Sequence, residues 1–140
     1  MIQRIKFLAV AAIAAVLVAC GGGGDDTTPN FAGNYSFSTF TKTTDTCGGT
    51  SAATIEGGTD VIVQNGREIT AGESKGTVDG DNGGYTLSET QVINGVTVVA
   101  SIAVRSTSPG ATTFNVQLSS VGTLGNVTCS IIYTGTATKV

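Results

Sequence analysis

Few side chains in this 140-residue chain could carry chemistry, because it has no histidine. That absence excludes Ser-His-Asp and Cys-His nucleophilic arrangements, zinc–histidine sites and the commonest general base near neutral pH. Three cysteines and ten acidic residues remain as candidate reactive groups, together with one adjacent serine–lysine pair. The sequence therefore predicts a protein that is not an enzyme, with no catalytic residue, unless one of these groups lies in a reactive arrangement.

The segment "DGDNGG", residues 79–84, is the best candidate for a metal site. Its Asp-x-Asp spacing with glycine resembles the start of an EF-hand calcium loop, in which oxygen ligands recur at fixed positions. Gly83 stands where the third ligand belongs, and Thr90 stands where the bidentate glutamate belongs. We therefore expect a turn between two strands, with Asp79 and Asp81 as only a weak candidate for calcium, and we expect no metal and no cofactor.

Ser74 and Lys75 are the adjacent pair that could suggest a serine–lysine dyad. Neighbouring residues on a strand point to opposite faces, so their side chains cannot form a productive hydrogen bond. We therefore expect this pair to have no catalytic role.

The first nineteen residues have the layout of a secretory signal peptide. Arg4 and Lys6 give a charged start, residues 7–18 are wholly apolar, and small Ala19 precedes Cys20. The apolar run is shorter than the roughly 20 residues that a helix needs to cross a bilayer. A cleaved signal, residues 1–19, is therefore favoured over a membrane-anchoring helix.

The residues Leu17-Val18-Ala19-Cys20 resemble the lipobox of bacterial lipoproteins, and the resemblance covers residues 1–20. It implies that the signal is removed before Cys20 and that this cysteine is lipidated. Residue 21 is Gly and not Asp, which in Gram-negative lipoproteins implies the outer membrane. The resemblance thus implies a protein attached to the outer membrane by the lipid on Cys20, facing the periplasm or exported to the surface.

Residues 20–32 are predicted to form a flexible tether between the lipid and the folded domain. Four glycines disfavour local order, and Asp25 and Asp26 keep the segment solvated. The domain itself is expected to span residues 33–140.

The charge of the mature chain excludes a nucleic-acid partner. Two of the seven basic residues lie in the signal, so five basic and ten acidic residues remain, for a net charge of −5. Nucleic-acid binding depends on cations that neutralise phosphates, and this chain has too few.

If Cys20 carries the lipid, Cys47 and Cys129 remain as a pair. An isolated pair in an oxidising periplasm most often forms a disulfide, and two free thiols are the alternative. We therefore expect a bond between Cys47 and Cys129.

The composition predicts an all-β domain. The chain is rich in Thr and Val, contains 20 Gly and has no Trp, and no run after residue 20 has apolar residues at helical spacing. Asn94-Gly95 predicts a hairpin that pairs Leu87 with Ile102 and Tyr85 with Val104. Further hairpins are expected to pair Ile62 with Ile69, Ile102 with Phe114, and Cys129, Ile131 and Tyr133 with Leu118, Val116 and Phe114.

The expected disulfide also bears on the architecture. Cys47 follows the first predicted strand and Cys129 lies near the start of the last, so a bond between them predicts that these strands are neighbours. We therefore predict a small up-and-down antiparallel β-barrel of eight or nine strands, with a two-sheet β-sandwich as the alternative.

Two functions of different classes fit these features. The first is a non-enzymatic structural or interaction role in the cell envelope. The alternative is a lipocalin-like carrier of a small apolar ligand, because Gly33-Asn34-Tyr35 resembles the Gly-x-Trp start of lipocalins with Tyr in place of Trp. An eight-strand barrel can either fill with side chains or hold one small ligand, so the packing of the interior discriminates between them.

Overall fold

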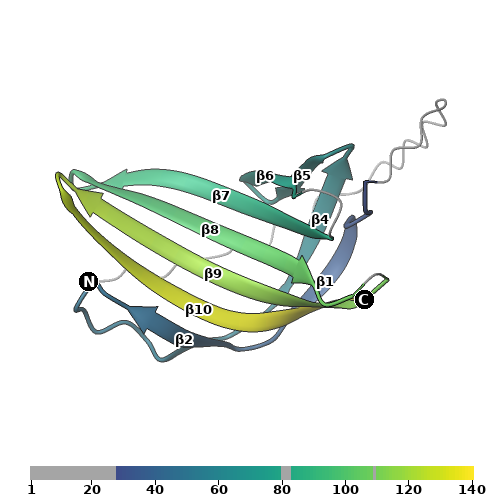
Figure 1. Cartoon of the computed structure of the whole chain (residues 1–140), viewed down its shortest axis with the longest axis horizontal. Helices are drawn as coiled ribbons and strands as arrows, with labels where there is room; N and C mark the ends of the chain where they lie inside the picture. Colours follow the sequence, from purple (N-terminus) through teal and green to yellow (C-terminus); the bar gives the residue numbers. More distant parts are fainter. Residues whose placement is uncertain (1–27, 80–82, 109) are drawn as a thin grey trace.

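The computed structural model describes residues 28–79, 83–108 and 110–140. In this part of the chain the secondary structure is all β, and no helix is long and apolar enough to cross a membrane. Its strands, shown in Figure 1, are β1 (Gly33–Phe37), β2 (Phe40–Asp45), β3 (Thr54–Ile55), β4 (Thr59–Asn65), β5 (Glu68–Ala71), β6 (Ser74–Val78), β7 (Gly84–Ile93), β8 (Val96–Ser106), β9 (Thr113–Leu124) and β10 (Val127–Lys139).

Eight of these strands form a closed antiparallel barrel. The sheet runs in the order β1-β4-β5-β6-β7-β8-β9-β10, and β10 also pairs with β1 to complete the ring. The predicted all-β up-and-down barrel is therefore confirmed, and the alternative β-sandwich is not the fold. Closure removes the exposed strand edges that would be a hazard in a sheet rich in Thr and Val.

The two remaining strands lengthen this barrel. β2 follows β1 along the same side of β10, and β3 precedes β4 on the opposite side of β2. The hydrogen bonds from Phe37 N to Gly58 O and from Lys42 N to Ala53 O keep the register of the β1–β4 and β2–β3 pairings continuous across the breaks. β1 with β2, and β3 with β4, therefore act as two long interrupted strands of one hairpin.

The seam between the first and last strands is closed by a covalent bond. Cys47 and Cys129 form a disulfide with a Cα–Cα distance of 4.8 Å. It extends the β2–β10 ladder, in which Asp45 lies opposite Ile131 and Thr46 N donates to Ser130 O. The predicted disulfide, and the predicted adjacency of the first and last strands, are both present.

The hairpin at Asn94-Gly95 has the predicted register. Leu87 pairs with Ile102, and Asn94 and Gly95 have φ values of 51° and 81°, as a type I′ turn requires. The predicted pairing of Ile62 with Ile69 is wrong, because Ile69 pairs with Gln64. The turn there is Gly66-Arg67 and not Asn65-Gly66, and glycine takes the first central position, which needs a positive φ.

The predicted registers of the last two hairpins are also wrong. Ile102 pairs with Leu118 and not with Phe114, because a turn closed by Ala111 N and Ser108 O lengthens the connection between β8 and β9. Tyr133 pairs with Leu118, because the turn at Gly125-Asn126 has only two residues and both strands run on to meet it. In each of these hairpins the observed partner is displaced from the predicted one by an even number of residues, so the side chains keep their predicted faces.

The core lies inside the ring, where alternate residues of each strand point. Its buried members are Phe31, Tyr35, Phe40, Ile62, Ile69, Ala71, Val78, Tyr85, Leu87, Val104, Phe114, Val116, Tyr133 and Ala137. Phe31 belongs to this core although it precedes β1, so the packed chain begins ahead of the domain start expected at residue 33.

We predict that the double variant Cys47→Ser/Cys129→Ser unfolds more easily than the wild type. The bond closes a loop with a sequence separation of 82, and removing it should lower the free energy of unfolding by about 4 kcal/mol through the entropy of the unfolded chain. Urea denaturation measures the loss, and reduction and alkylation of the wild type should reproduce it. Unchanged stability would show that the strand ladder alone closes the seam.

Candidate functional site

The barrel axis, where a carrier would hold its ligand, is filled by side chains. The largest fully buried ones are Tyr35, Tyr85, Ile69, Leu87 and Val104. Their rings contact one another at steep angles: the centroids of Phe31 and Tyr85 lie 5.2 Å apart in an edge-to-face pair, and those of Tyr35 and Phe114 lie 5.7 Å apart in a tilted pair. This packing is typical of a small barrel whose interior is a core and not a cavity.

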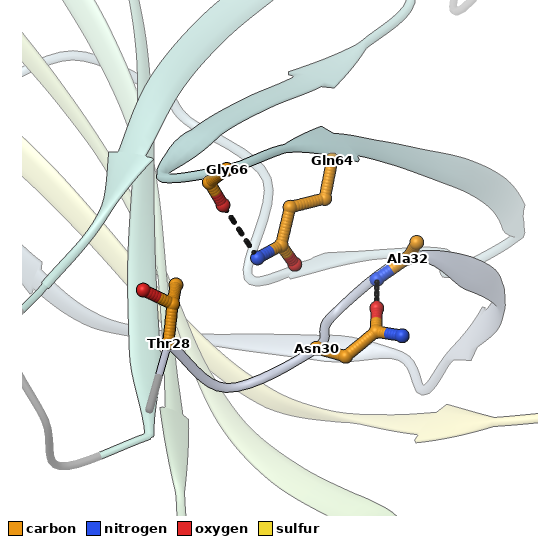
Figure 2. A pocket seen from close by; sticks show the side chains of 5 residues that line it. All are labelled: Thr28, Asn30, Ala32, Gln64 and Gly66. Carbon is orange, nitrogen blue, oxygen red and sulfur yellow. Dashed lines mark hydrogen bonds between the residues drawn. The ribbon is translucent and has the colours of Figure 1, made fainter. Parts of the chain in front are cut away.

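Gln64 on β4 holds the segment that carries Phe31 into the barrel. Its amide nitrogen donates to Gly66 O at 2.8 Å, as Figure 2 shows, and to Pro29 O at 2.9 Å. Its amide oxygen accepts from Phe31 N at 2.7 Å. One side chain thereby pairs with three backbone groups of the entering chain and the β4–β5 turn. These bonds fix where the amino-terminal segment leaves the barrel.

Residues 28–32, which Gln64 holds against the barrel, are called the strap below. A surface recess of about 330 Å³ lies beside the strap, lined by Thr28, Asn30, Ala32, Gln64 and Gly66. Asn30 Oδ1 accepts from Ala32 N at 2.9 Å, so the polar groups of the lining are engaged with each other, as Figure 2 shows. The recess contains no charged side chain that could hold an ionic ligand. Its lining offers only the neutral polar groups that are usual at surface turns.

A second recess, of about 520 Å³, includes outward-facing residues of β8, β9 and β10. Arg105 is its one charged side chain. The guanidinium is already committed, because it donates to Tyr85 O and Val104 O, each at 2.9 Å, and forms an ion pair with Asp79. This recess therefore offers no free cation to a ligand.

The three interior tyrosines differ in how their hydroxyls are satisfied. Tyr35 donates to Phe31 O and Tyr133 donates to Ala52 O, each at 2.9 Å. The Tyr85 hydroxyl has no hydrogen-bond partner among the described residues, although its side chain is fully buried. Burial raises the pKa of Tyr35 to about 12, and burial also raises the pKa of Tyr85, helped by nearby Tyr35 and Asp60.

One polar cluster was not predicted from the sequence: Lys42, Asp45 and Ser51. The Lys42 ammonium lies 3.1 Å from Asp45 Oδ2, 3.1 Å from Ser51 O and 2.8 Å from Ser51 Oγ. A β-bulge in β2, between the pairings of Lys42 and Thr44 with β10, puts Lys42 and Asp45 on one face. Residues three apart on a regular strand would face opposite ways, so alternation could not reveal this cluster.

The hydrogen-bond pattern of this cluster is structural and not that of a nucleophile. Lys42 uses its three N–H groups as donors, and the Ser51 hydroxyl bonds to Asp45 rather than to a free base. The bond from Ser51, followed by that from Lys42, lowers the pKa of Asp45 below 3.8, which makes it a weak proton acceptor. The cluster ties the 46–53 loop to β2.

The sequence-predicted candidates are placed as follows. Asp79 forms an ion pair with Arg105 at 2.8 Å and accepts from the Thr86 hydroxyl, so it is occupied by protein partners. Asp81 and Cys20 lie outside the described residues. Over the described ranges no three His, Cys, Asp or Glu side chains gather as a metal site. Ser74 is half-buried and Lys75 exposed, in keeping with opposite faces of β6.

Comparison of the chain with protein-family models, with curated proteins and with solved structures gives no match.

A matched pair of tyrosine variants tests whether the filled axis is simply a core. Tyr85→Phe removes a buried hydroxyl that has no hydrogen-bond partner in the described part of the chain, so the free energy of unfolding should stay level or rise by about 1 kcal/mol. Tyr35→Phe leaves Phe31 O without its donor and should lower that free energy by about 1–3 kcal/mol. Urea denaturation compares the two. An equal loss in both variants would mean that the Tyr85 hydroxyl has a partner, such as a ligand.

Proposed function

We propose that the protein is anchored to the outer membrane by a lipid on Cys20 and has a non-enzymatic structural or interaction role in the cell envelope. The lipobox Leu17–Cys20 and the glycine at position 21 support the anchor. The Cys47–Cys129 disulfide fits this location, because such bonds persist in oxidising compartments.

The observation that carries the non-enzymatic role is the filled axis of the barrel. Tyr35, Tyr85 and Leu87 lie on the axis with almost no exposed surface, and the ring of Phe31 closes the space beside them. The polar cluster of Lys42, Asp45 and Ser51, which brings a hydroxyl and an amine together, is saturated by its own hydrogen bonds. What the protein offers to other molecules is thus its surface.

The strap at Gln64 supports a definite orientation of that surface. Asn30, in the strap, accepts from Lys139 at the end of β10, whereas Val127 at the start of β10 lies at the opposite end of the barrel. Thirteen residues of strand span about 40 Å. Figure 1 shows the hairpin tips β7–β8 and β9–β10 at the end of the barrel opposite the start of β1, so in this proposal they would point away from the lipid.

The carrier of a small apolar ligand is the second candidate, and two observations favour it. The fold is a closed eight-strand barrel, an architecture that can hold one ligand. The hydroxyl of Tyr85, which bonds to none of the residues that the structure describes, could also bond to a polar atom of such a ligand. Against it stands the packing of Phe31, Tyr35 and Phe114 across the axis.

We predict that metabolic labelling with palmitate marks the protein and that Cys20→Ala abolishes the label, because Cys20 is the proposed acceptor. Cys47→Ser/Cys129→Ser serves as the control and should keep the label, since these thiols are joined in a disulfide. Gel fluorography of the membrane fraction measures both. Label that survives Cys20→Ala would refute the anchor.

We predict that native mass spectrometry of protein purified from its host finds no stoichiometric small molecule beyond the lipid itself, because the axis is filled. A panel of lipids and metabolites should likewise leave the melting temperature unchanged, since only a ligand that binds the folded state raises it. A co-purifying ligand that is lost in Tyr85→Phe would replace the proposed role with the carrier.

A further inference from the structure

We propose that the second recess, on the outer face of β8, β9, β10 and β2, binds an uncharged saccharide. This inference deepens the interaction role proposed above and rests on it, because it names what the surface of the barrel would contact. The recess has a volume of about 520 Å³, which is on the scale of sites that hold small organic ligands. It lies on the wall of the barrel and not on the filled axis.

The lining of the recess consists of two neighbouring rows of outward-facing side chains that cross the strands. The first row crosses β8, β9, β10 and β2 through Ala103, Gln117, Thr134 and Thr41. The second row crosses β8, β9 and β10 through Arg105, Asn115 and Thr136. Neighbouring strands lie about 4.8 Å apart and alternate residues of one strand about 7 Å apart, so the polar groups form an array. Such an array suits a ligand that carries several polar groups of its own.

The amides and hydroxyls of this array are uncommitted. Asn115 and Gln117 have exposed amides, and neither amide bonds to any residue that the structure describes. The hydroxyls of Thr41, Thr134 and Thr136 likewise have no partner within the described ranges. Amides and hydroxyls both donate and accept hydrogen bonds, as the hydroxyls of a sugar ring do. The lining therefore matches the hydrogen-bonding capacity of a saccharide.

Arg105 leaves the recess without an unpaired charge. Its guanidinium is held toward β7, where it donates to Tyr85 O and forms an ion pair with Asp79. Gly84 leaves room for this arrangement, because a Cβ at that position would lie 2.8 Å from Arg105 Cδ. An anionic ligand would find no unpaired cation here, whereas an uncharged ligand needs none.

The position of the recess favours a saccharide over a peptide. An extended peptide gains affinity by pairing with a free strand edge or by placing side chains in apolar pockets. β8, β9 and β10 are each paired on both sides along the recess, so their backbones offer no edge. Among the described residues that line it from the outer face, Ala103 alone is apolar. Each hydrogen bond replaces one to water, so we expect a dissociation constant of about 1 mM.

NMR titration of the purified, disulfide-bonded protein tests the site, with maltotriose and chitotriose as uncharged probes and trigalacturonate as the anionic control. The side-chain NH₂ signals of Asn115 and Gln117 should shift with the uncharged probes and much less with trigalacturonate. Gln117→Met removes one amide of the array at nearly constant size, so the affinity should fall about 3- to 10-fold. Gln91→Met makes the same change on an exposed part of β7 outside the recess and should leave the affinity unchanged.

A second variant tests the shape of the recess. Ala103→Leu fills it while both amides remain, so the shifts should disappear at an unchanged melting temperature. Shifts that avoid Asn115 and Gln117, or equal affinities of Gln117→Met and Gln91→Met, would overturn the proposal. So would the peptide STSTST shifting these signals when the sugars do not, since the recess would then serve a peptide.

Co-sedimentation with purified cell-wall sacculi identifies the source of the saccharide. Sedimentation of the wild type that Gln117→Met weakens assigns a glycan of the envelope, whereas shifts with soluble sugars alone assign a free saccharide, and both results support the site. Failure of every sugar probe refutes the site and leaves the proposed lipid anchor and the filled axis standing. Palmitate label that survives Cys20→Ala, or a ligand on the axis, would instead refute the proposed function without changing the NMR result.

Discussion

The structure depends on the pairing of its last strand with its first. One side of β10 pairs with β9. The other side pairs with β1 near the end of β10 and with β2 near the middle of β10. Without that second side the chain would be an open meander with two exposed edges, each a template for aggregation. The Cys47–Cys129 bond holds this seam at the point where the β2–β10 ladder ends. Closure also explains why the interior is apolar and aromatic, because a barrel of eight strands encloses little more than its own side chains.

The β2–β10 ladder at this seam is irregular, because β2 contains a bulge. One extra residue, Thr43, shifts the register against Ile132 and Tyr133 and rotates the strand locally. The consequence is the Lys42–Asp45–Ser51 cluster, which satisfies three polar groups at the mouth of the barrel and holds the loop that ends in the hydrogen bond to Tyr133. A hydroxyl and an amine in contact are therefore no sign of catalysis here. They satisfy one another's hydrogen bonds where the bulge in β2 brings them together.

The faces of the strands could be predicted from the sequence, whereas several of their pairing registers could not, for one physical reason. The side-chain period of a strand is two, so Ile102 faces inward whether it lies opposite Phe114 or Leu118. Asn94-Gly95 predicts the register of its hairpin because both residues take positive φ. The connection before β9 contains an additional turn at Ser108, which no sequence pattern indicates. Phe31 was assigned to the tether, since only the bonds to Gln64 reveal that it enters the core.

The unequal lengths of the strands separate the two ends of the molecule. At the end of the strap, Phe31 and Gln64 close the barrel and consume the available polar groups. At the other end, β7–β10 extend beyond the four- and five-residue strands β5 and β6, so no strand of the described residues pairs with the last residues of β7 on the side away from β8. The exposed part of this edge is short, because the register of the β6–β7 ladder places Ser74 opposite Glu89 and leaves only residues 90–93 of β7 beyond β6; very short edges are one way in which proteins avoid edge-to-edge pairing.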